Sequence, residues 1–280
     1  MNKMNVFKGS DEYVVTNELM NAVNVSIALQ KPLLIKGEPG TGKTMLAEAI
    51  SKSLGMELII WGIKSTTKAQ EGLYVYDTVQ RLYDSQFGEG NVGDIKQYIK
   101  LGKLGEAFNS DKQVVLLIDE IDKADLEFPN DLLWELDKME FYINETKETI
   151  KTKHRPIVII TSNAEKELPD AFLRRCIFHY IEFPDQEKMA EIIKVHFGDI
   201  DRKLQEKALD AFYEIRKMDS IQKKPSTSEL LDWIQALMIS GVDIKNLSKE
   251  MPFIGVLLKK NQDIDTMEEI KTKGYSLKRW

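Results

Sequence analysis

The chain has 280 residues, 42% hydrophobic and 30% charged, with only 8 prolines and 16 glycines, which excludes a disordered or fibrous protein. The net charge of −6, with no stripe of Lys and Arg, disfavours nucleic acid as a partner. The single cysteine, Cys176, excludes an internal disulfide, and the three scattered histidines form no zinc signature. The N-terminus lacks the apolar core of a signal peptide and the apolar runs are strand-sized, so we expect a cytoplasmic protein without a membrane span.

Predicted strands and helices alternate over the first part of the chain. Apolar residues recur at helical spacing from Tyr13 to Gln30, and Lys31-Pro32 interrupts that pattern. Near-continuous apolar runs such as VVLLID are typical of parallel strands covered on both faces. The predicted strands cover 32–37, 56–61, 114–119, 156–163 and 178–183, and the predicted helices cover 13–30, 44–55 and 129–139, with a helix end at 171–176. This alternation predicts an α/β fold with a parallel sheet.

Two segments interrupt this alternation. YVYDTVQRLYDSQF, at 74–87, is predicted to form a helix, and a glycine-rich loop follows it at 87–94. EFYI, the polar turn NETKE and TIK, at 140–151, are predicted to form a β-hairpin. Both segments are insertions into the sheet domain.

The remainder of the chain reads as helical. Phe183-Pro184 is typical of the point where a sheet domain stops. The segments that follow each place apolar residues on one helical face, and they cover 187–197, 203–218 and 227–240. We therefore expect two domains, 1–184 with the sheet and 185–280 as a small all-α lid.

GEPGTGKT is the motif most specific for a function. It follows a predicted strand and opens a predicted helix, which is the frame that a phosphate-binding loop requires. Lys43 is expected to reach the β and γ phosphates of ATP, and the Thr44 hydroxyl is expected to hold Mg²⁺. The expected nucleotide-binding residues are Gly37, Glu38, Pro39, Gly40, Thr41, Gly42, Lys43 and Thr44.

Two acidic residues end the third predicted strand, VVLLIDE. Asp119 is expected to hold the water shell of Mg²⁺, and Glu120 to orient and polarise the attacking water. The fourth strand, PIVIITSN, ends in Asn163, whose neutral amide suits a sensor of the γ-phosphate or of the water. Taken alone, an Asn at this place is more typical of the start of a turn before AEKEL, and only the order of the strands favours the sensor.

Arg174 and Arg175 close the helix end AFLRRC. Basic side chains at such a position complement the helix dipole, and the residues alone allow that interpretation. The other interpretation is an arginine finger that reaches the γ-phosphate bound by a neighbouring subunit.

These motifs, taken in order, resemble an AAA+ ATPase: GEPGTGKT, VVLLIDEID, IITSN, LPDAFLRRC and a helical lid. The insertions resemble those of the MoxR family, and PLLIKGEPGTGKT, KSTTKAQEGLYVYDTVQRL, LPDAFLRRCIFHYIEFP and KPSTSELLDW resemble its CoxD-like subgroup. The resemblance implies an αβα sandwich with a P-loop and a parallel sheet, followed by an all-α lid. It also implies a ring homo-oligomer, usually a hexamer, with ATP at the subunit interfaces. A von Willebrand A domain protein and a client protein are the implied partners.

The resemblance maps the arginine finger onto Arg175, with Arg174 as a substitute, because the chain has Arg-Arg-Cys where other MoxR proteins have an acidic-Arg-Phe triplet. The family's lid arginine should fall near TSELLDW, which offers Ser228 and Glu229 instead. Arg216, Lys223 and Lys224 are the alternatives for that role.

Three functions follow from these features. The first is an Mg-ATP-dependent remodeller or maturation factor acting on a client protein, which includes metalloenzyme clients. The second is an ATP-gated scaffold with little turnover, and the third is a DNA-linked AAA+ motor, which the acidic balance disfavours.

Overall fold

The computed structural model describes residues 6–88, 91–163, 165–242 and 247–272, and its contacts divide the chain into two compact units. The first unit contains Val15–Gly37 and Gly42–Ile181 together with the residues before Asp11. The second unit contains the chain from Glu182 onward together with Asp11–Val14 and Glu38–Thr41. The division into domains at residues 184 and 185 stays a prediction.

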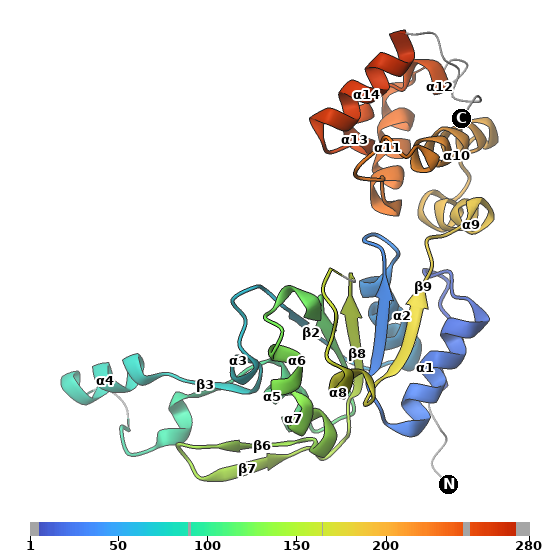
Figure 1. The fold of residues 1–280 in the computed structure, drawn as a ribbon. Coiled ribbons are helices and arrows are strands. Elements are labelled where there is room, and N and C mark those ends of the chain that lie inside the picture. The colour runs from blue at the N-terminus through green and yellow to red at the C-terminus, as the bar shows by residue number, and fades with distance from the viewer. Residues whose placement is uncertain (1–5, 89–90, 164, 243–246, 273–280) are drawn as a thin grey trace. The chain divides into compact units, whose positions relative to one another are not determined.

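The first unit is built on one five-stranded sheet (Figure 1). Its strands are β1 (Leu33–Gly37), β2 (Leu58–Gly62), β5 (Val115–Asp119), β8 (Ile157–Ser162) and β9 (Ile177–Ile181). They are all parallel, in the order β2-β5-β8-β1-β9. The carboxyl ends of all five strands therefore lie at the same edge, and β8 lies between β5 and β1. This arrangement confirms the predicted parallel α/β fold.

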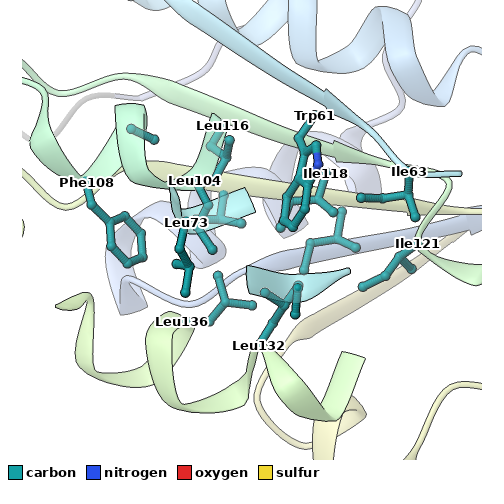
Figure 2. Packing of buried hydrophobic residues seen from close by; sticks show 14 of the residues in the cluster. Trp61, Ile63, Leu73, Leu104, Phe108, Leu116, Ile118, Ile121, Leu132 and Leu136 are labelled. Atoms are coloured by element: carbon teal, nitrogen blue, oxygen red, sulfur yellow. The ribbon is translucent and has the colours of Figure 1, made fainter. Parts of the chain in front are cut away.

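Helices cover both faces of this sheet. Side chains that alternate along the strands, among them Leu34, Leu116 and Ile160, share one buried cluster with residues of the helices that follow β2 and β5 (Figure 2). The opposite face is covered by α1, which packs against β1 and β9, and by α2, which packs against β1, β2, β5 and β8. The helices of the first unit are α1 (Asn17–Leu29), α2 (Lys43–Leu54), α3 (Ala69–Leu73), α4 (Thr78–Phe87), η1 (Ile95–Tyr98), α5 (Lys103–Asn109), η2 (Ile121–Lys123), α6 (Phe128–Asp131), α7 (Leu133–Lys138) and α8 (Asp170–Leu173).

The two insertions each contain an antiparallel strand pair. β6 (Glu140–Ile143) pairs with β7 (Glu148–Lys151), which confirms the predicted hairpin. β3 (Tyr74–Tyr76) pairs with β4 (Ile99–Leu101), so the helix predicted over 74–87 begins only at Thr78. The reason is local, because Tyr-Val-Tyr favours a strand and the Asp77 side chain caps α4 by accepting from the Gln80 amide.

Two other predicted helices differ at their boundaries. α1 begins at Asn17 rather than Tyr13 because the Thr16 hydroxyl accepts from the Leu19 amide and caps the helix there. The helix predicted over 129–139 is divided into α6 and α7 at Leu132, whose ψ of −5° departs from helical values while its side chain is fully buried.

The second unit is helical, as predicted. Its helices are α9 (Gln186–Phe197), α10 (Arg202–Lys217), α11 (Thr227–Ser240), α12 (Leu247–Glu250), α13 (Ile254–Leu257) and α14 (Asn261–Thr272). Their core surrounds Trp233, which is fully buried and donates from its indole nitrogen to the Pro252 carbonyl over 2.7 Å. α14 lies in the charged stretch after Lys259, within the range 185–280 that is expected to be all-α. Among the described residues, no helix combines the length and the apolar character needed to cross a membrane.

Candidate nucleotide and magnesium site

The loop between β1 and α2 carries GEPGTGKT. Gly40 and Gly42 have φ values of 77° and 83°, a backbone conformation that residues with a Cβ rarely adopt. Gly42 is the N-cap of α2 and offers no side chain to the first turn of that helix. The amides of that turn therefore stay available to an anion, and the positive end of the helix dipole favours one there.

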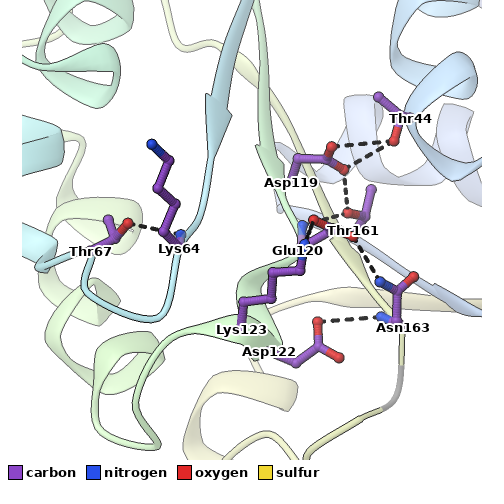
Figure 3. Close-up of polar contacts among 9 residues, drawn as sticks. All are labelled: Thr44, Lys64, Thr67, Asp119, Glu120, Asp122, Lys123, Thr161 and Asn163. Carbon is purple, nitrogen blue, oxygen red and sulfur yellow. Dashed lines mark hydrogen bonds and ion pairs between the residues drawn. The ribbon is translucent and has the colours of Figure 1, made fainter.

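Lys43 and Thr44 are the first two residues of α2. The Lys43 ammonium is buried and donates to the Gly37 carbonyl at the end of β1 over 2.9 Å. The Thr44 hydroxyl lies 3.1 Å from Oδ1 and 3.3 Å from Oδ2 of Asp119 at the end of β5 (Figure 3). A hydroxyl and a carboxylate from two elements, 75 residues apart in sequence, thus meet at one point.

Thr161, the penultimate residue of β8, links the acidic residue that ends β5 to the one that follows it. Its hydroxyl donates to Asp119 Oδ1 over 2.6 Å and accepts from the Glu120 amide over 2.8 Å (Figure 3). The Thr161 side chain is fully buried. A buried hydrogen bond to a carboxylate is stronger than one between neutral groups, so Thr161 fixes the orientation of Asp119.

Glu120 has a left-handed backbone, with φ of 59° and ψ of 50°, which turns the chain sharply after β5. A non-glycine residue in this conformation costs about 1–2 kcal/mol, and the bond from its amide to Thr161 offsets part of that cost. Glu120 Oε1 accepts from the Asn163 side-chain amide over 2.9 Å, while Oε2 pairs with the Lys123 ammonium. Both carboxylate oxygens are therefore engaged. The hydrogen bond to Glu120 raises the pKa of Lys123.

Asp122 holds the backbone of the sensor candidate Asn163 and of Glu165. The Asp122 side chain is buried, and its Oδ1 accepts from the Asn163 amide over 3.3 Å. Its Oδ2 accepts from the Glu165 amide over 3.0 Å. Because these bonds join η2 to the segment after β8, the ends of β5 and β8 are held in a fixed relation.

The sequence model of the family described as "ATPase family associated with various cellular activities (AAA)" matches residues 33–185, more than half of the chain. The chain belongs to the AAA family. The matched range runs from β1 to the residue before α9 and contains every residue of the cluster around Asp119 and Glu120.

Several curated AAA relatives are distantly similar. Over 197 residues the chain is 26% identical to Pachytene checkpoint protein 2 of Saccharomyces cerevisiae, covering 62% of this chain and 32% of that protein. Over 201 residues it is 28% identical to the dog homologue and 27% to the human one, covering 67% of this chain and 42% of each relative. The chain thus spans less than half the length of these relatives.

The AAA domain uses ATP and Mg²⁺, and the residues at the carboxyl edge of the sheet fit both. Mg²⁺ prefers oxygen ligands, and the Thr44 hydroxyl and Asp119 carboxylate are a hydroxyl and an anionic oxygen donor side by side. The loop with two positive-φ glycines, the amides that begin α2 and the Lys43 ammonium suit a polyphosphate. Four of the predicted residues, Thr44, Asp119, Glu120 and Asn163, therefore gather where α2 begins and where β5 and β8 end.

The two arginines after α8 do not join this cluster. Arg175 donates from Nε to Asp137 Oδ2 over 2.6 Å and from Nη1 to the Ala171 carbonyl over 2.8 Å. Arg174 is exposed, and no ion pair joins it to another described residue. Cys176 beside them is partly buried and burial raises the pKa of its thiol to about 12, which fits a core residue.

The cations considered for the lid arginine lie in different surroundings in the second unit. The Arg216 guanidinium lies 3.3 Å from the centroid of the Phe183 ring and donates to the Pro225 carbonyl over 2.5 Å. Lys223 bonds through its backbone amide to Asp263. Glu229 closes a capping box with Ser226 at the start of α11, a structural use of the position where the resemblance expects an arginine.

Sequence reasoning missed Thr161, Asp122 and Lys123 as members of this site. A threonine inside the otherwise aliphatic strand IVIITS was the available signal, because a buried hydroxyl needs a partner. For Asp122 and Lys123 the signal was their place in the turn directly after Glu120.

Proposed function

We propose that this chain is an ATP-driven remodeller of a client protein, in which Glu120 activates the water that attacks ATP. The observation that carries the proposal is the cluster in which Thr44, Asp119, Thr161, Glu120 and Asn163 are joined by hydrogen bonds. The membership of this chain in the AAA family supports ATP hydrolysis as the reaction.

In this proposal the phosphate-binding residues are those of 37–44. The loop amides and Lys43 bind the phosphates, and Thr44 with Asp119 holds Mg²⁺ and its water shell. When bound, Mg²⁺ neutralises charge on the phosphate oxygens. Thr161 keeps Asp119 oriented toward Thr44, so the hydroxyl and the carboxylate face the same point.

Glu120 orients the attacking water and accepts its proton, and Asn163 reports on the γ-phosphate. The side-chain amide of Asn163 holds Glu120 Oε1, which supports a shared role for the two residues. Lys123 pairs with the other oxygen, Oε2, so neither carboxylate oxygen is open to a water molecule while that pair persists. Release of Lys123 would then be part of activation.

An arginine from a neighbouring subunit completes the site in this proposal. The Arg174 side chain is exposed and can contact a neighbouring subunit, whereas Arg175 would first have to break its ion pair with Asp137. The motifs shared with the MoxR family and its CoxD-like subgroup support a ring, a hexamer in the usual case, and a von Willebrand A domain partner. They also support chaperone-like work on a client, metalloenzymes included.

The test is steady-state phosphate release by the full chain with Mg-ATP. Glu120→Gln keeps the shape of the side chain but removes the base, so we expect a fall in kcat of about 100-fold or more, with binding of ATP retained. Chelation of Mg²⁺ should abolish turnover in the native chain. The matched control is Glu148→Gln, since Glu148 is an exposed acid in the hairpin strand β7.

An unchanged rate in Glu120→Gln would contradict the assignment of the base. The second function, an ATP-gated scaffold, is favoured by one observation, the pairing of Lys123 with Glu120. A scaffold would bind ATP and assemble, but native turnover would be negligible and Lys123→Met would not raise it.

The client is sought with the Glu120→Gln variant held in its ATP-bound state. Recovery of a von Willebrand A domain protein with this variant, and not with Lys43→Ala, would support the proposed partner. Its absence from repeated experiments with both variants would contradict that part of the proposal.

A further inference from the structure

Asp137, on α7, is the partner of Arg175 within the same chain. Arg175 donates from Nε to Asp137 Oδ2 over 2.6 Å, and the two side chains are 41% and 44% exposed. Within the described ranges of the chain, this pair uses one guanidinium nitrogen and one carboxylate oxygen. A half-exposed pair of this kind contributes little to stability, because water screens the charges and both side chains lose freedom. Arg175 can therefore leave Asp137 at small cost.

A second arginine, Arg155, lies beside the same carboxylate. Its Nη2 donates over 3.3 Å to the carbonyl of Leu136, the residue directly before Asp137. Its Nε is buried and has no hydrogen-bond partner in the part of the chain that the structure describes. Burial lowers the pKa of Arg155, and the negative charge of Asp137 opposes that shift. A buried donor without an acceptor is destabilising, so Arg155 would gain from an acceptor.

We propose that Arg155 binds Asp137 in place of Arg175 when Arg175 turns to the phosphate bound by a neighbouring subunit. This inference rests on the proposed function, in which Arg175 is one of the two arginines considered for the interfacial role. Asp137 paired with Arg175 holds that arginine within its own subunit, and Asp137 paired with Arg155 releases it. Asp137 and Arg155 are thus positioning residues, because they act through Arg175.

The exchange keeps the charge of Asp137 compensated. The guanidinium of Arg155 stays protonated at neutral pH, so a cation faces the carboxylate in both arrangements. The hydrogen bond that Arg175 gives up is half-exposed, whereas the donor that replaces it, Arg155 Nε, is buried. Water screens a buried pair less, which favours the second arrangement once Arg175 has another anion to bind.

The test compares steady-state phosphate release by the full chain and its variants at saturating Mg-ATP. Asp137→Asn keeps the shape but removes the charge that holds Arg175, so we expect the rate to rise about two- to fivefold, the range that an exposed ion pair allows. Arg155→Met removes the alternative partner of Asp137 and should lower the rate by a similar factor. Asp111→Asn is the matched control, since the exposed Asp111 also forms an ion pair over 2.6 Å, with Lys153, and its rate should equal that of the native chain.

The double variant separates the exchange from a merely structural role of Arg155. In the Asp137→Asn background, Arg155→Met should have no further effect, because no carboxylate is left to exchange. An equal loss in both backgrounds would assign Arg155 a structural role and overturn the proposal. A rate that Asp137→Asn leaves unchanged or lowers would also overturn it, while hydrolysis by Glu120 would stand. No turnover by the native chain would contradict the proposed function itself, and this inference with it.

Discussion

At the scale of single residues, Glu120 is the most constrained position of the site. It occupies a left-handed backbone conformation, and its amide and both carboxylate oxygens have partners in Thr161, Asn163 and Lys123. Strained backbones persist only where several contacts hold them. The fold therefore sets the backbone position of Glu120, and only its carboxylate has to leave Lys123 in the proposed reaction.

Thr161 is a positioning residue whose effect is measurable apart from ATP binding. Thr161→Val keeps the shape but removes a hydrogen bond to a charged group, worth about 1.5–3 kcal/mol, so we expect kcat to fall about 10–100-fold. The Mg²⁺ concentration for half-maximal rate should rise, because Asp119 loses its orientation. Affinity for a fluorescent ATP analogue without Mg²⁺ should stay near the native value.

Thr161→Ser is the control for that variant, because it keeps the hydroxyl and loses only a methyl group. It should restore most of the rate and the native Mg²⁺ requirement. If Thr161→Ser loses as much activity as Thr161→Val, the hydroxyl does not account for the loss, and the positioning role is wrong.

At the scale of elements, the first unit depends on a close approach between α3 and α5. A Cβ at Gly105, on α5, would lie 2.0 Å from the Leu73 carbonyl oxygen at the end of α3. A second glycine, Gly102, lies equally close to the Glu71 carbonyl. These two positions require glycine for space, since neither has a positive φ.

Gly105→Ala tests this packing because two effects oppose each other. Alanine within a helix gains about 1 kcal/mol over glycine, whereas forced overpacking costs about 1–3 kcal/mol. With backbone atoms at 2.0 Å the clash should win, so we expect a lower free energy of unfolding by denaturant titration. Gly62→Ala, in β2, has no atom within 4 Å of its Cβ and should be neutral or stabilising. Equal effects of both variants would contradict the close approach.

At the scale of the whole molecule, the proposed site has one part in each of two subunits. The cluster around Glu120 lies within one chain, and Arg174 is exposed away from any described ion pair. If the arginine acts across an interface, Glu120→Gln and Arg174→Ala chains are each inactive alone, while their mixture pairs an intact Glu120 with an intact arginine.

We expect an equal mixture of these two variants to regain roughly a quarter of the native phosphate release, by random assembly into a ring. The rate per chain of the native protein should also rise with protein concentration until assembly is complete. The mixture is repeated with Arg175→Ala in place of Arg174→Ala, and the arginine that acts is the one whose variant is inactive alone and regains activity when mixed with Glu120→Gln. Arg202→Ala is the control, because Arg202 is an exposed arginine on α10. A mixture that stays inactive with both arginine variants would contradict an interfacial site.

Local sequence patterns were sufficient for the strands of the sheet and for the phosphate loop. β1, β5 and β8 are short apolar runs, and their burial on both faces makes them readable without any partner. GEPGTGKT has a backbone requirement of its own, because Gly40 and Gly42 must adopt positive φ. The parallel α/β fold and the AAA family follow from these features.

Tertiary structure decided what depends on distant partners. The sequence could not bring Thr161 to Asp119 or Asn163 to Glu120, because strand order, not spacing along the chain, places β8 beside β5. β3 is a strand because it pairs with β4, which lies further along the same insertion. The pattern of α4 shows which side is apolar, but only the bonds of Asp84 to Tyr98 and of Arg81 to Tyr76 show that this side faces solvent.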